Sequence, residues 1–421
     1  MLHLIEDAAS EPAQYGALAA RLATQLAERL TAGAGSAARE VGFAHLPARF
    51  DTARFPDAVQ HVCTQGALVA SGLLWRDRAC PGGVQGELDI DEIVTRARHG
   101  DVVVPVHPAN GEFAALREAF ATRAEREGVA LMRYAVARAS SVACVIDQYQ
   151  TLHDAAMQDR FGRWRDADAD MQAQAPSSEA GASLLIALIG SESEQREQYP
   201  ATLAALGDAA DALALDIDVR FVAAQSLDAS NVAEHLRGAH AVLLPGGADM
   251  SRVAGQIAAA RFAWAARVPI VGLCLGMQSM ATALARVALE RDDIGMREAE
   301  PHARVASFVP IRESSDGVLV HRAGVQTIAL THDSLLAHWL GGTQAAIRCN
   351  HRYRLEGSLE APLARVGVTI AARDASGEIA DAIEARDHPF FAGMQGHPEL
   401  SSREGAAHPL LLAWLKAARE R

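Results

Sequence analysis

Lysine is nearly absent from this sequence of 421 residues, because the 39 basic residues include a single lysine, Lys416. A phosphate-binding loop of the GxxxxGK[ST] type and a lysine Schiff base both need a lysine in a pocket. A glycine-rich phosphate fingerprint and metal-ligand spacings are also missing. These absences argue against a Walker-type nucleotide site, and we expect neither a cofactor nor a metal.

Paired cysteines and long apolar runs are missing as well. The five cysteines are scattered and never form a CxxC pair, which argues against a disulfide framework or a zinc knuckle. No apolar run approaches about 18 residues, and the start, MLHLIEDAAS, lacks the features of a secretion signal. The net charge of -13 argues against the concentrated basic face that nucleic-acid binding needs. We expect a cytoplasmic protein that binds neither membrane nor nucleic acid.

The length favours two domains. A polar stretch rich in small residues, 166–183, is the expected linker between an N-terminal α/β domain, 1–165, and a C-terminal domain, 184–421. In the C-terminal domain short apolar runs alternate with helical spacing, which predicts an α/β fold with a parallel sheet flanked by helices.

The pattern also places individual elements. Expected strands lie in 101–108, 128–137, 184–190, 216–225, 240–247 and 269–273. Expected helices lie in 15–32, 113–128, 199–215, 231–239 and 251–268. His107, at a strand end, is better explained as a structural histidine than as a ligand.

The segment GLCLG places a cysteine between two glycines directly after an apolar run. The small residues Gly272 and Gly276 suit the tight strand-to-helix turn called a nucleophile elbow. The helix expected after Cys274 directs its positive N-terminal end at the sulfur, which favours the thiolate. Cys274 is therefore a candidate nucleophile, although packing would also explain a small cysteine beside glycines.

A nucleophilic cysteine needs a base, and the base needs an orienting acceptor. Near the C-terminus His397 and Glu399 flank Pro398, and in an extended segment alternate side chains share a face. Proline is expected to prevent a helix here. The pair would supply base and acceptor, whereas the alternative is a surface turn.

A third segment, PGG, ends another apolar run. The backbone amides of Gly246 and Gly247 have no side chains in front of them, and with the Leu275 amide they would form an oxyanion hole.

In the order PGG, GLCLGMQ and HPE, the three segments resemble the class I (triad-type) glutamine amidotransferases. HPFFAGMQGHPELSSR and NHRYRLE are similar to stretches of the glutaminase domain of CTP synthase, and this resemblance runs from about Leu184 to the C-terminus. The N-terminal part does not resemble the synthetase domain of that family.

The resemblance implies roles for the residues that match its motifs. Cys274 would attack the glutamine side-chain amide and form a thioester, His397 would protonate the leaving ammonia and then activate water, and Glu399 would orient His397. The oxyanion hole would use Gly247 and Leu275. The implied substrate-binding residues are Gly246, Gln278, Glu298 and Arg352, of which Glu298 matches the residue for the α-ammonium group.

The sequence departs from the family pattern at several positions. PGGFG is here PGGAD, with Ala248 and Asp249, and Gly396 replaces the phenylalanine that commonly precedes HPE. Asn350 stands where the family has an arginine. These changes leave the three catalytic residues in place but alter the expected pocket wall.

We expect L-glutamine or a related amide as substrate and a separate synthetase or ligase chain as the acceptor of ammonia. Two alternatives stay open at this point. One is a free-standing amidase or γ-glutamyl hydrolase, and the other is a non-catalytic regulatory or docking module. The N-terminal domain would bind the acceptor, dock the partner or form a homo-oligomer.

Overall fold

The computed structural model describes the chain except residues 34–40, 45, 47–49, 51–52, 61–70, 81–87, 109–112, 140–141, 168–182 and 313–316. The chain divides into two compact units. The N-terminal unit is Met1–Ser178 with Arg196–Ala204, and the C-terminal unit is Glu179–Gln195 with Ala205–Arg421. The predicted linker, 166–183, falls almost entirely outside the described residues.

The N-terminal unit is built on a seven-stranded sheet in the order β2-β3-β1-β4-β5-β6-β7. Strands β2, β3, β1 and β4 are parallel, and β4 to β7 continue as antiparallel neighbours. The strands are β1 (Leu2–Glu6), β2 (Val41–Phe43), β3 (Asp101–Val106), β4 (Leu131–Ala139), β5 (Val142–Asp147), β6 (Leu152–Gln158) and β7 (Trp164–Asp166). The helices are α1 (Ala17–Gly33), η1 (Pro56–Gln60), α2 (Ser71–Ala79), α3 (Ile90–Ala97) and α4 (Phe113–Arg126).

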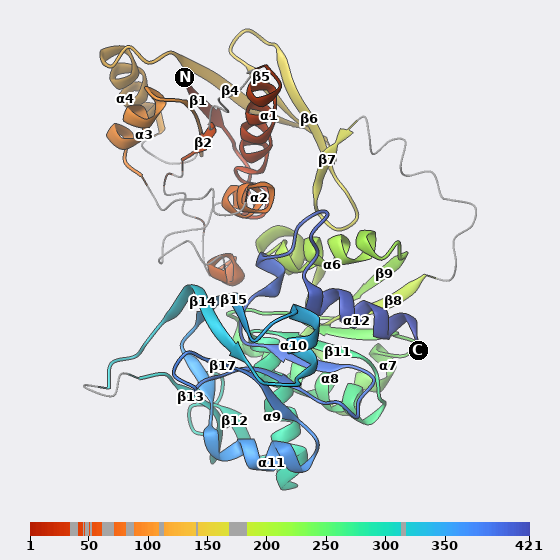
Figure 1. The fold of residues 1–421 in the computed structure, drawn as a ribbon. Helices are drawn as coiled ribbons and strands as arrows, with labels where there is room; N and C mark the ends of the chain where they lie inside the picture. The colour runs from red at the N-terminus through yellow and green to blue at the C-terminus, as the bar shows by residue number, and fades with distance from the viewer. Residues whose placement is uncertain are drawn as a thin grey trace. The chain divides into compact units, whose positions relative to one another are not determined.

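Helices cover both faces of this sheet (Figure 1). Buried residues of α1 pack with Val103, whereas those of α3 and α4 pack with Val104, and neighbouring residues of a strand face opposite sides. The predicted helices 15–32 and 113–128 are confirmed as α1 and α4. His107 donates a hydrogen bond of 2.9 Å to the carbonyl of Ala9, as the structural interpretation predicts.

The C-terminal unit contains a nine-stranded sheet in the order β15-β14-β17-β18-β19-β11-β10-β8-β9. Its parallel strands are β8 (Leu184–Leu188), β9 (Ile217–Phe221), β10 (Ala241–Leu244), β11 (Ile270–Leu273) and β19 (Phe391–Met394). Its antiparallel strands are β14 (Arg322–Leu330), β15 (Gln344–His351), β17 (Thr369–Asp374) and β18 (Ala380–Glu384). A smaller sheet contains β12 (Ile294–Met296), β13 (Val305–Pro310) and β16 (Tyr353–Leu355).

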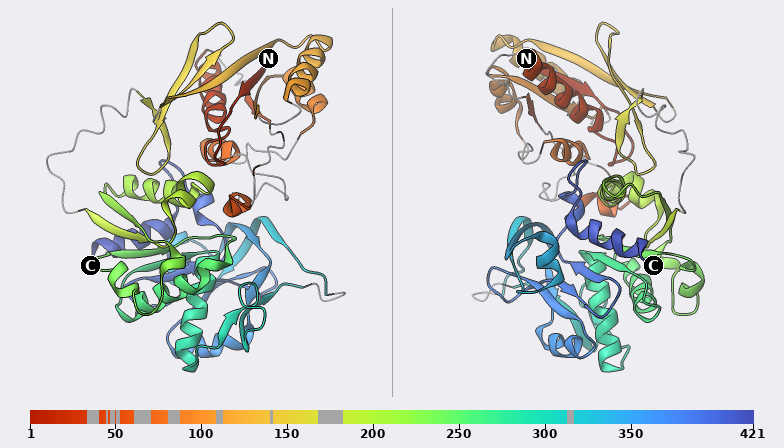
Figure 2. Two further views of the ribbon diagram at one scale, coloured as in Figure 1. Left: turned by 180° about the vertical axis from the view of Figure 1, so that it is seen from behind. Right: turned by 45° about the vertical axis from the view of Figure 1, so that its right-hand side comes forward.

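The helices of this part of the chain connect and cover the strands (Figures 1 and 2). The longer ones are α6 (Ala201–Ala212), α8 (Val253–Ala265), α9 (Leu275–Leu289) and α12 (Pro409–Arg419). Shorter ones are η2 (Glu194–Gln198), η3 (Ala224–Ser226), α7 (Val232–His235), η4 (Met250–Arg252), α10 (Leu335–Leu340), η5 (Gly357–Leu359), α11 (Glu360–Arg365) and η6 (Pro398–Leu400). Among the described helices, none has both the length and the apolar character needed to cross a bilayer.

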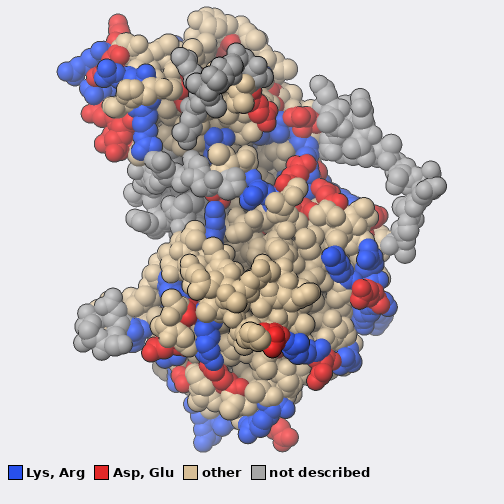
Figure 3. Space-filling view, viewed as in Figure 1, with Lys and Arg blue, Asp and Glu red and all other residues tan. Residues whose placement is uncertain are grey.

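The α/β class and the parallel sheet flanked by helices are confirmed. The parallel part of the sheet consists of the five neighbouring strands β9, β8, β10, β11 and β19. The antiparallel extension was not predicted. Strand β14 shows why, because its exposed residues Ala323, Val325 and Ala329 are apolar, so most of the polar half of an alternating pattern is missing. Figure 3 shows a broad area of the visible face of this unit that carries no described Lys, Arg, Asp or Glu.

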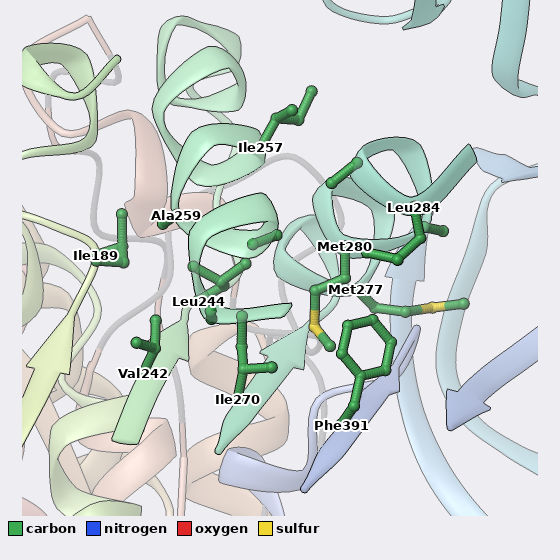
Figure 4. Packing of buried hydrophobic residues seen from close by; sticks show 14 of the residues in the cluster. Ile189, Val242, Leu244, Ile257, Ala259, Ile270, Met277, Met280, Leu284 and Phe391 are labelled. Atoms are coloured by element: carbon green, nitrogen blue, oxygen red, sulfur yellow. The ribbon is translucent and has the colours of Figure 1, made fainter. Parts of the chain in front are cut away.

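The main core of the C-terminal unit lies between the parallel strands and helices α8 and α9 (Figure 4). Val242, Leu244 and Ile270 on the strands face Met277 and Met280 on α9. Helix α9 comes very close to β10, because a Cβ atom added to Gly276 would clash with the carbonyl oxygen of Leu244 and lie 2.8 Å from its carbonyl carbon. A glycine is therefore needed where the helix crosses the strand end.

We predict that Gly276→Ala destabilises the C-terminal unit although alanine is the better helix former. The clash with the Leu244 backbone should lower the free energy of unfolding by about 3 kcal/mol, which exceeds the helix-propensity gain of about 1 kcal/mol. Urea unfolding of the full chain, followed by circular dichroism, measures the change. The matched control is Gly357→Ala, where an added Cβ has nothing within 4 Å, and an equal loss in both variants would contradict the prediction.

Helix α12 begins with a histidine cap. The Nδ1 atom of His408 accepts a hydrogen bond of 3.2 Å from the Leu410 amide, so it must be unprotonated. Burial lowers the pKa of His408 from 6.5 to about 4, with Glu399 opposing part of that shift.

We predict that this cap makes stability fall as the pH is lowered from about 6.5 to about 4. In that window the unfolded chain binds a proton at His408 that the folded chain does not, so the free energy of unfolding should fall by up to about 1.4 kcal/mol per pH unit. His408→Asn keeps a capping acceptor but does not titrate. Urea unfolding at pH 7 and pH 5 should therefore show a smaller loss for the variant, and equal losses would show that His408 does not carry the effect.

Candidate active site

Three neighbouring parallel strands bring the three predicted segments to one edge of the sheet. In the register, Leu244 of β10 pairs with Gly272 of β11, and Leu273 of β11 pairs with Met394 of β19. The residues that follow these strands are PGG, Cys274 and the HPE segment. Since ligands of open parallel sheets bind at the carboxyl ends of the strands, this edge is the natural site for chemistry.

Cys274 occupies a tight turn between β11 and α9. Its backbone has φ 48° and ψ -104°, a left-handed conformation that costs a non-glycine residue about 1–3 kcal/mol. The Cys274 amide donates a hydrogen bond of 2.8 Å to the Met394 carbonyl, which fixes the turn to β19. A Cβ atom added to Gly272 would lie 2.7 Å from the Met277 nitrogen, so the turn leaves no room for a side chain there. The predicted nucleophile elbow therefore describes the local geometry.

His397 and Glu399 form a fully buried pair. The Nδ1–H group of His397 donates to Glu399 Oε1 at 2.7 Å, and both side chains are 0% exposed. The backbone amide of His397 donates a hydrogen bond of 2.8 Å to the carbonyl of Arg348 on β15, which anchors the backbone of His397.

The prediction of an extended backbone for this segment is wrong. Pro398–Leu400 form a short 3-10 helix instead of an extended strand. Proline is accepted because it stands at the first helical position, where its missing N–H has no helical partner to lose. The turn still brings the carboxylate of Glu399 to the imidazole of His397.

Two neighbouring groups act on the imidazole of His397. Burial by itself lowers the pKa of His397, but the Cys274 sulfur and the Glu399 carboxylate outweigh burial and raise this pKa to about 10. The cationic ring is thus stabilised between a sulfur and a carboxylate, as an acid that donates a proton to a leaving group requires.

The PGG turn lies directly beside this pair. A Cβ atom added to Gly246 would lie 3.2 Å from His397 Cε1 and 3.5 Å from Cys274 Cβ, so all three residues border the same small space. Gly247 is buried in the same turn, and Leu275 begins α9, whose first amides have no partner within the helix. Their predicted role as oxyanion hole stays a prediction.

The turn is supported by a residue that the sequence analysis missed. The side-chain amide of Gln256, on α8, donates a hydrogen bond of 3.0 Å to the Pro245 carbonyl. Its oxygen accepts a hydrogen bond of 2.8 Å from the Ser279 hydroxyl. In the sequence, a glutamine within the otherwise apolar start of this helix is the signal that could have indicated the role. The structure shows that Gln256 is fully buried.

Gln278 lies on the first turn of α9 and is nearly fully buried. Its side-chain amide donates a hydrogen bond of 3.2 Å to the side-chain oxygen of Gln395. The side-chain nitrogen of Gln395 in turn donates a hydrogen bond of 3.6 Å to the Cys274 sulfur. Gln395 was also missed, although it stands two residues before His397.

Glu298 and Arg352 are brought close enough to interact. Loss of water around the carboxylate raises the pKa of Glu298, and the positive charge of Arg352 partly offsets this. Arg352 donates 3.2 Å to His321 Nδ1, and His321 donates 2.8 Å to Asn350 Oδ1. Asn350, which departs from the family pattern, thus orients the histidine that holds Arg352.

A cluster of potential metal ligands lies near the site. Cys349, His351 and Asp381 are buried, and their ligand atoms lie within 4.8 Å of one another. The guanidinium of Arg322 contacts the two Asp381 oxygens at 2.6 and 3.0 Å and His351 Nε2 at 3.2 Å. A protein cation is therefore already bound to Asp381 and His351.

The protonation of the cluster agrees with this. Burial raises the pKa of Cys349 to about 12 and lowers the pKa of His351 to about 3. A neutral thiol beside a guanidinium is a poor metal ligand, since cysteine binds metals as the thiolate. The cluster therefore fits an internal ion pair better than a metal centre.

Two of the departures from the family pattern have a structural explanation. A Cβ atom at Gly396 would lie 2.9 Å from Ile347 Cδ1 and 3.0 Å from the Arg348 carbonyl, so β15 leaves no room for a phenylalanine. Asp249 caps η4 by accepting 2.9 Å from the Ser251 amide, whereas Ala248 is exposed.

The part of the chain that carries these residues is similar to known proteins. A family model described as "Glutamine amidotransferase class-I" matches residues 209–417. CTP synthase of Herpetosiphon aurantiacus is 30% identical over 238 residues, which cover 56% of this chain and 45% of the relative. CTP synthase of Parasynechococcus marenigrum is 32% identical over 250 residues, covering 57% and 45%. The chain thus spans less than half of the length of these relatives.

A solved structure supports the fold. The glutaminase domain of Trypanosoma brucei CTPS, determined with bound acivicin, matches with a TM-score of 0.54 and 23% identity over 57% of this chain and 95% of that chain. Residues 209–417, within the C-terminal unit, therefore match the class I glutamine amidotransferase family, and this part of the chain is similar in sequence to CTP synthases and has the fold of a CTPS glutaminase domain.

Proposed function

We propose that this protein hydrolyses the side-chain amide of glutamine through a cysteinyl thioester and passes the ammonia to a separate synthetase. The observation that carries the proposal is the buried imidazole of His397, held at 2.7 Å by Glu399 and charged through its interaction with the Cys274 sulfur. Such a row of nucleophile, acid–base and orienting acceptor is the arrangement that acyl transfer requires.

In the first half-reaction the Cys274 sulfur attacks the amide carbon and a sulfur–carbon bond forms. The charge that develops on the carbonyl oxygen is received by the amides of Gly247 and Leu275. The His397 imidazolium gives its proton to the departing nitrogen, so that the carbon–nitrogen bond breaks and ammonia leaves.

In the second half-reaction His397, now neutral, accepts a proton from water. The resulting hydroxide attacks the thioester carbon, the sulfur–carbon bond breaks, and glutamate leaves while Cys274 recovers its electron pair. Glu399 keeps the Nδ1–H tautomer of His397 in place throughout, since its carboxylate accepts from that nitrogen.

Recognition of the amino acid is assigned to the neighbouring charges. An α-ammonium group suits the Glu298 carboxylate, and an α-carboxylate suits the Arg352 guanidinium. The contact between Arg352 and His321 supports this assignment, because it limits the directions in which the guanidinium can point.

The separate synthetase is proposed because the N-terminal part of this sequence does not resemble the synthetase domain of CTP synthase and contains no lysine. The CTP synthases that it matches extend beyond the matched region. The single lysine of this chain, Lys416, lies in α12. An acceptor-activating step that needs a lysine at a nucleotide is therefore assigned to a partner polypeptide.

We predict that Cys274→Ala reduces glutamate and ammonia formation from glutamine by about 10⁴-fold or more, because it removes the nucleophile. The matched control is Cys144→Ala, which alters a cysteine of β5 in the other unit and should keep activity. A coupled glutamate assay, with and without candidate synthetases, gives both numbers. Full activity of Cys274→Ala would rule out the proposal, and rapid turnover of a larger amide without a partner would favour the free-standing amidase.

We predict that Glu399→Gln moves the alkaline limb of the kcat/KM profile to lower pH by about one unit or more. The carboxylate helps to raise the pKa of His397 to about 10, so removing its charge should make the imidazolium lose its proton earlier. Glutamine keeps an oxygen acceptor for Nδ1–H, so the ring position is preserved. Glu420→Gln, at an exposed carboxylate, is the control, and an unmoved limb in Glu399→Gln would contradict the assigned charge of His397.

A further inference from the structure

A buried amide contacts the sulfur of Cys274 in addition to the predicted triad. Gln395 directly follows β19, and its side chain is 0% exposed. Its Nε2 atom lies 3.6 Å from Cys274 Sγ, a distance at which an N–H group donates to sulfur. The sulfur therefore has a neutral hydrogen-bond donor besides the charged imidazole.

The direction of this amide is fixed by a second glutamine. The side-chain nitrogen of Gln278 donates 3.2 Å to Gln395 Oε1. An amide nitrogen only donates and an amide oxygen only accepts. In the structure the oxygen of Gln395 faces Gln278 and its NH2 group faces the sulfur, so both ends of this amide have a suitable partner.

The backbone of Gln395 is held just as firmly. Its amide donates 2.8 Å to the carbonyl of Asp381 on β18, and the carboxylate of Asp381 is clamped by Arg322. On the other side, the Cys274 amide donates 2.8 Å to Met394, the residue before Gln395. The donor and the sulfur are thus built onto adjacent strands that are bonded to each other.

A donor in this position acts on the charged form of the sulfur. A hydrogen bond to an anion is about twice as strong as one between neutral groups, and burial strengthens it further because water does not compete. Since the amide carries no charge of its own, it lowers the energy of the thiolate without changing the charge balance around His397.

We propose that Gln395 is a further catalytic residue, whose side-chain amide donates to the Cys274 sulfur and stabilises it as an anion, and that Gln278 positions this amide. The inference rests on the proposed function in taking Cys274 as the nucleophile. It assigns Gln278 a role through Gln395, beyond the substrate contact that the family resemblance implies.

The amide acts at two points of the cycle. Before attack it stabilises the electron pair on sulfur that forms the bond to carbon. When hydroxide has added to the thioester, the sulfur–carbon bond breaks and the electron pair returns to sulfur, where the same N–H group receives it. The proton of water has by then gone to His397, so no further acid is needed.

The test measures the reactivity of the Cys274 sulfur directly, and not the turnover of glutamine. The rate of alkylation of Cys274 by iodoacetamide is followed against pH in the full-length protein, with peptide mass spectrometry to separate Cys274 from the other cysteines. In Gln395→Met the donor is lost at similar side-chain volume. We expect the pH midpoint of alkylation to rise by about one unit, which is about a tenfold slower reaction below the midpoint.

The matched control is Gln198→Met. Gln198 is also a buried glutamine, but it belongs to the N-terminal unit, where its side-chain oxygen accepts a hydrogen bond from the Asp57 amide. This variant should keep the wild-type midpoint, so a shift in both variants would indicate general loosening and overturn the proposal. A midpoint of Gln395→Met within about 0.3 pH unit of wild type would also overturn it.

If Gln395→Met does not fold, Gln278→Met tests the same idea from the other end. Without Gln278 the amide of Gln395 is free to rotate, so a smaller rise in the same direction is expected, and no rise overturns the proposal. A failure of this proposal can be told apart from a failure of the proposed function. If Cys274→Ala keeps ammonia release while the alkylation shift appears, the glutaminase assignment fails and the contact between amide and sulfur stands.

Discussion

The close approach of helix α9 to strand β10 is the constraint on which the site depends. It is possible only because Gly276 has no side chain between the helix and the Leu244 carbonyl. The approach forces the chain to reverse sharply between β11 and α9, and the residue at the reversal, Cys274, takes a positive φ. The strained position points to function, since such strain persists only where surrounding packing enforces it. The core of α8 and α9 against the parallel strands supplies that packing.

The antiparallel half of the sheet has a different task from the parallel half. The parallel strands carry the reactive segments, whereas β15 and β18 supply backbone acceptors that hold them from behind. The Arg348 carbonyl receives the His397 amide, and the Asp381 carbonyl receives the Gln395 amide. The absence of a side chain at Gly396 follows from the same arrangement, because β15 occupies the space that a phenylalanine would need.

Two buried networks of charge lie close to Gln395. In one, the imidazolium of His397 lies between the Cys274 sulfur and Glu399. In the other, Arg322 lies between Asp381 and the neutral ring of His351. Buried charges are tolerated only when they are paired and hydrogen-bonded. Because each network contains its own counter-charges, the cost of burying its charged groups is offset.

The sequence by itself determined the class of the fold, the succession of strands and helices from β8 to α9, and the three residues that meet at the sheet edge, Cys274, His397 and Glu399. Apolar runs, glycine pairs and the HPE segment are local signals, which is why the sequence suffices for them. Short-range patterns also gave the elbow at Cys274. They did not give the turn at Pro398–Leu400, the antiparallel strands or the roles of Gln256, Gln395 and Arg322. Those depend on which strands become neighbours, and a buried glutamine or arginine has no meaning in a sequence until the partner that satisfies it is known. Only the tertiary structure decides that pairing, since the free energy of burying a polar group depends on contacts between residues far apart in the chain.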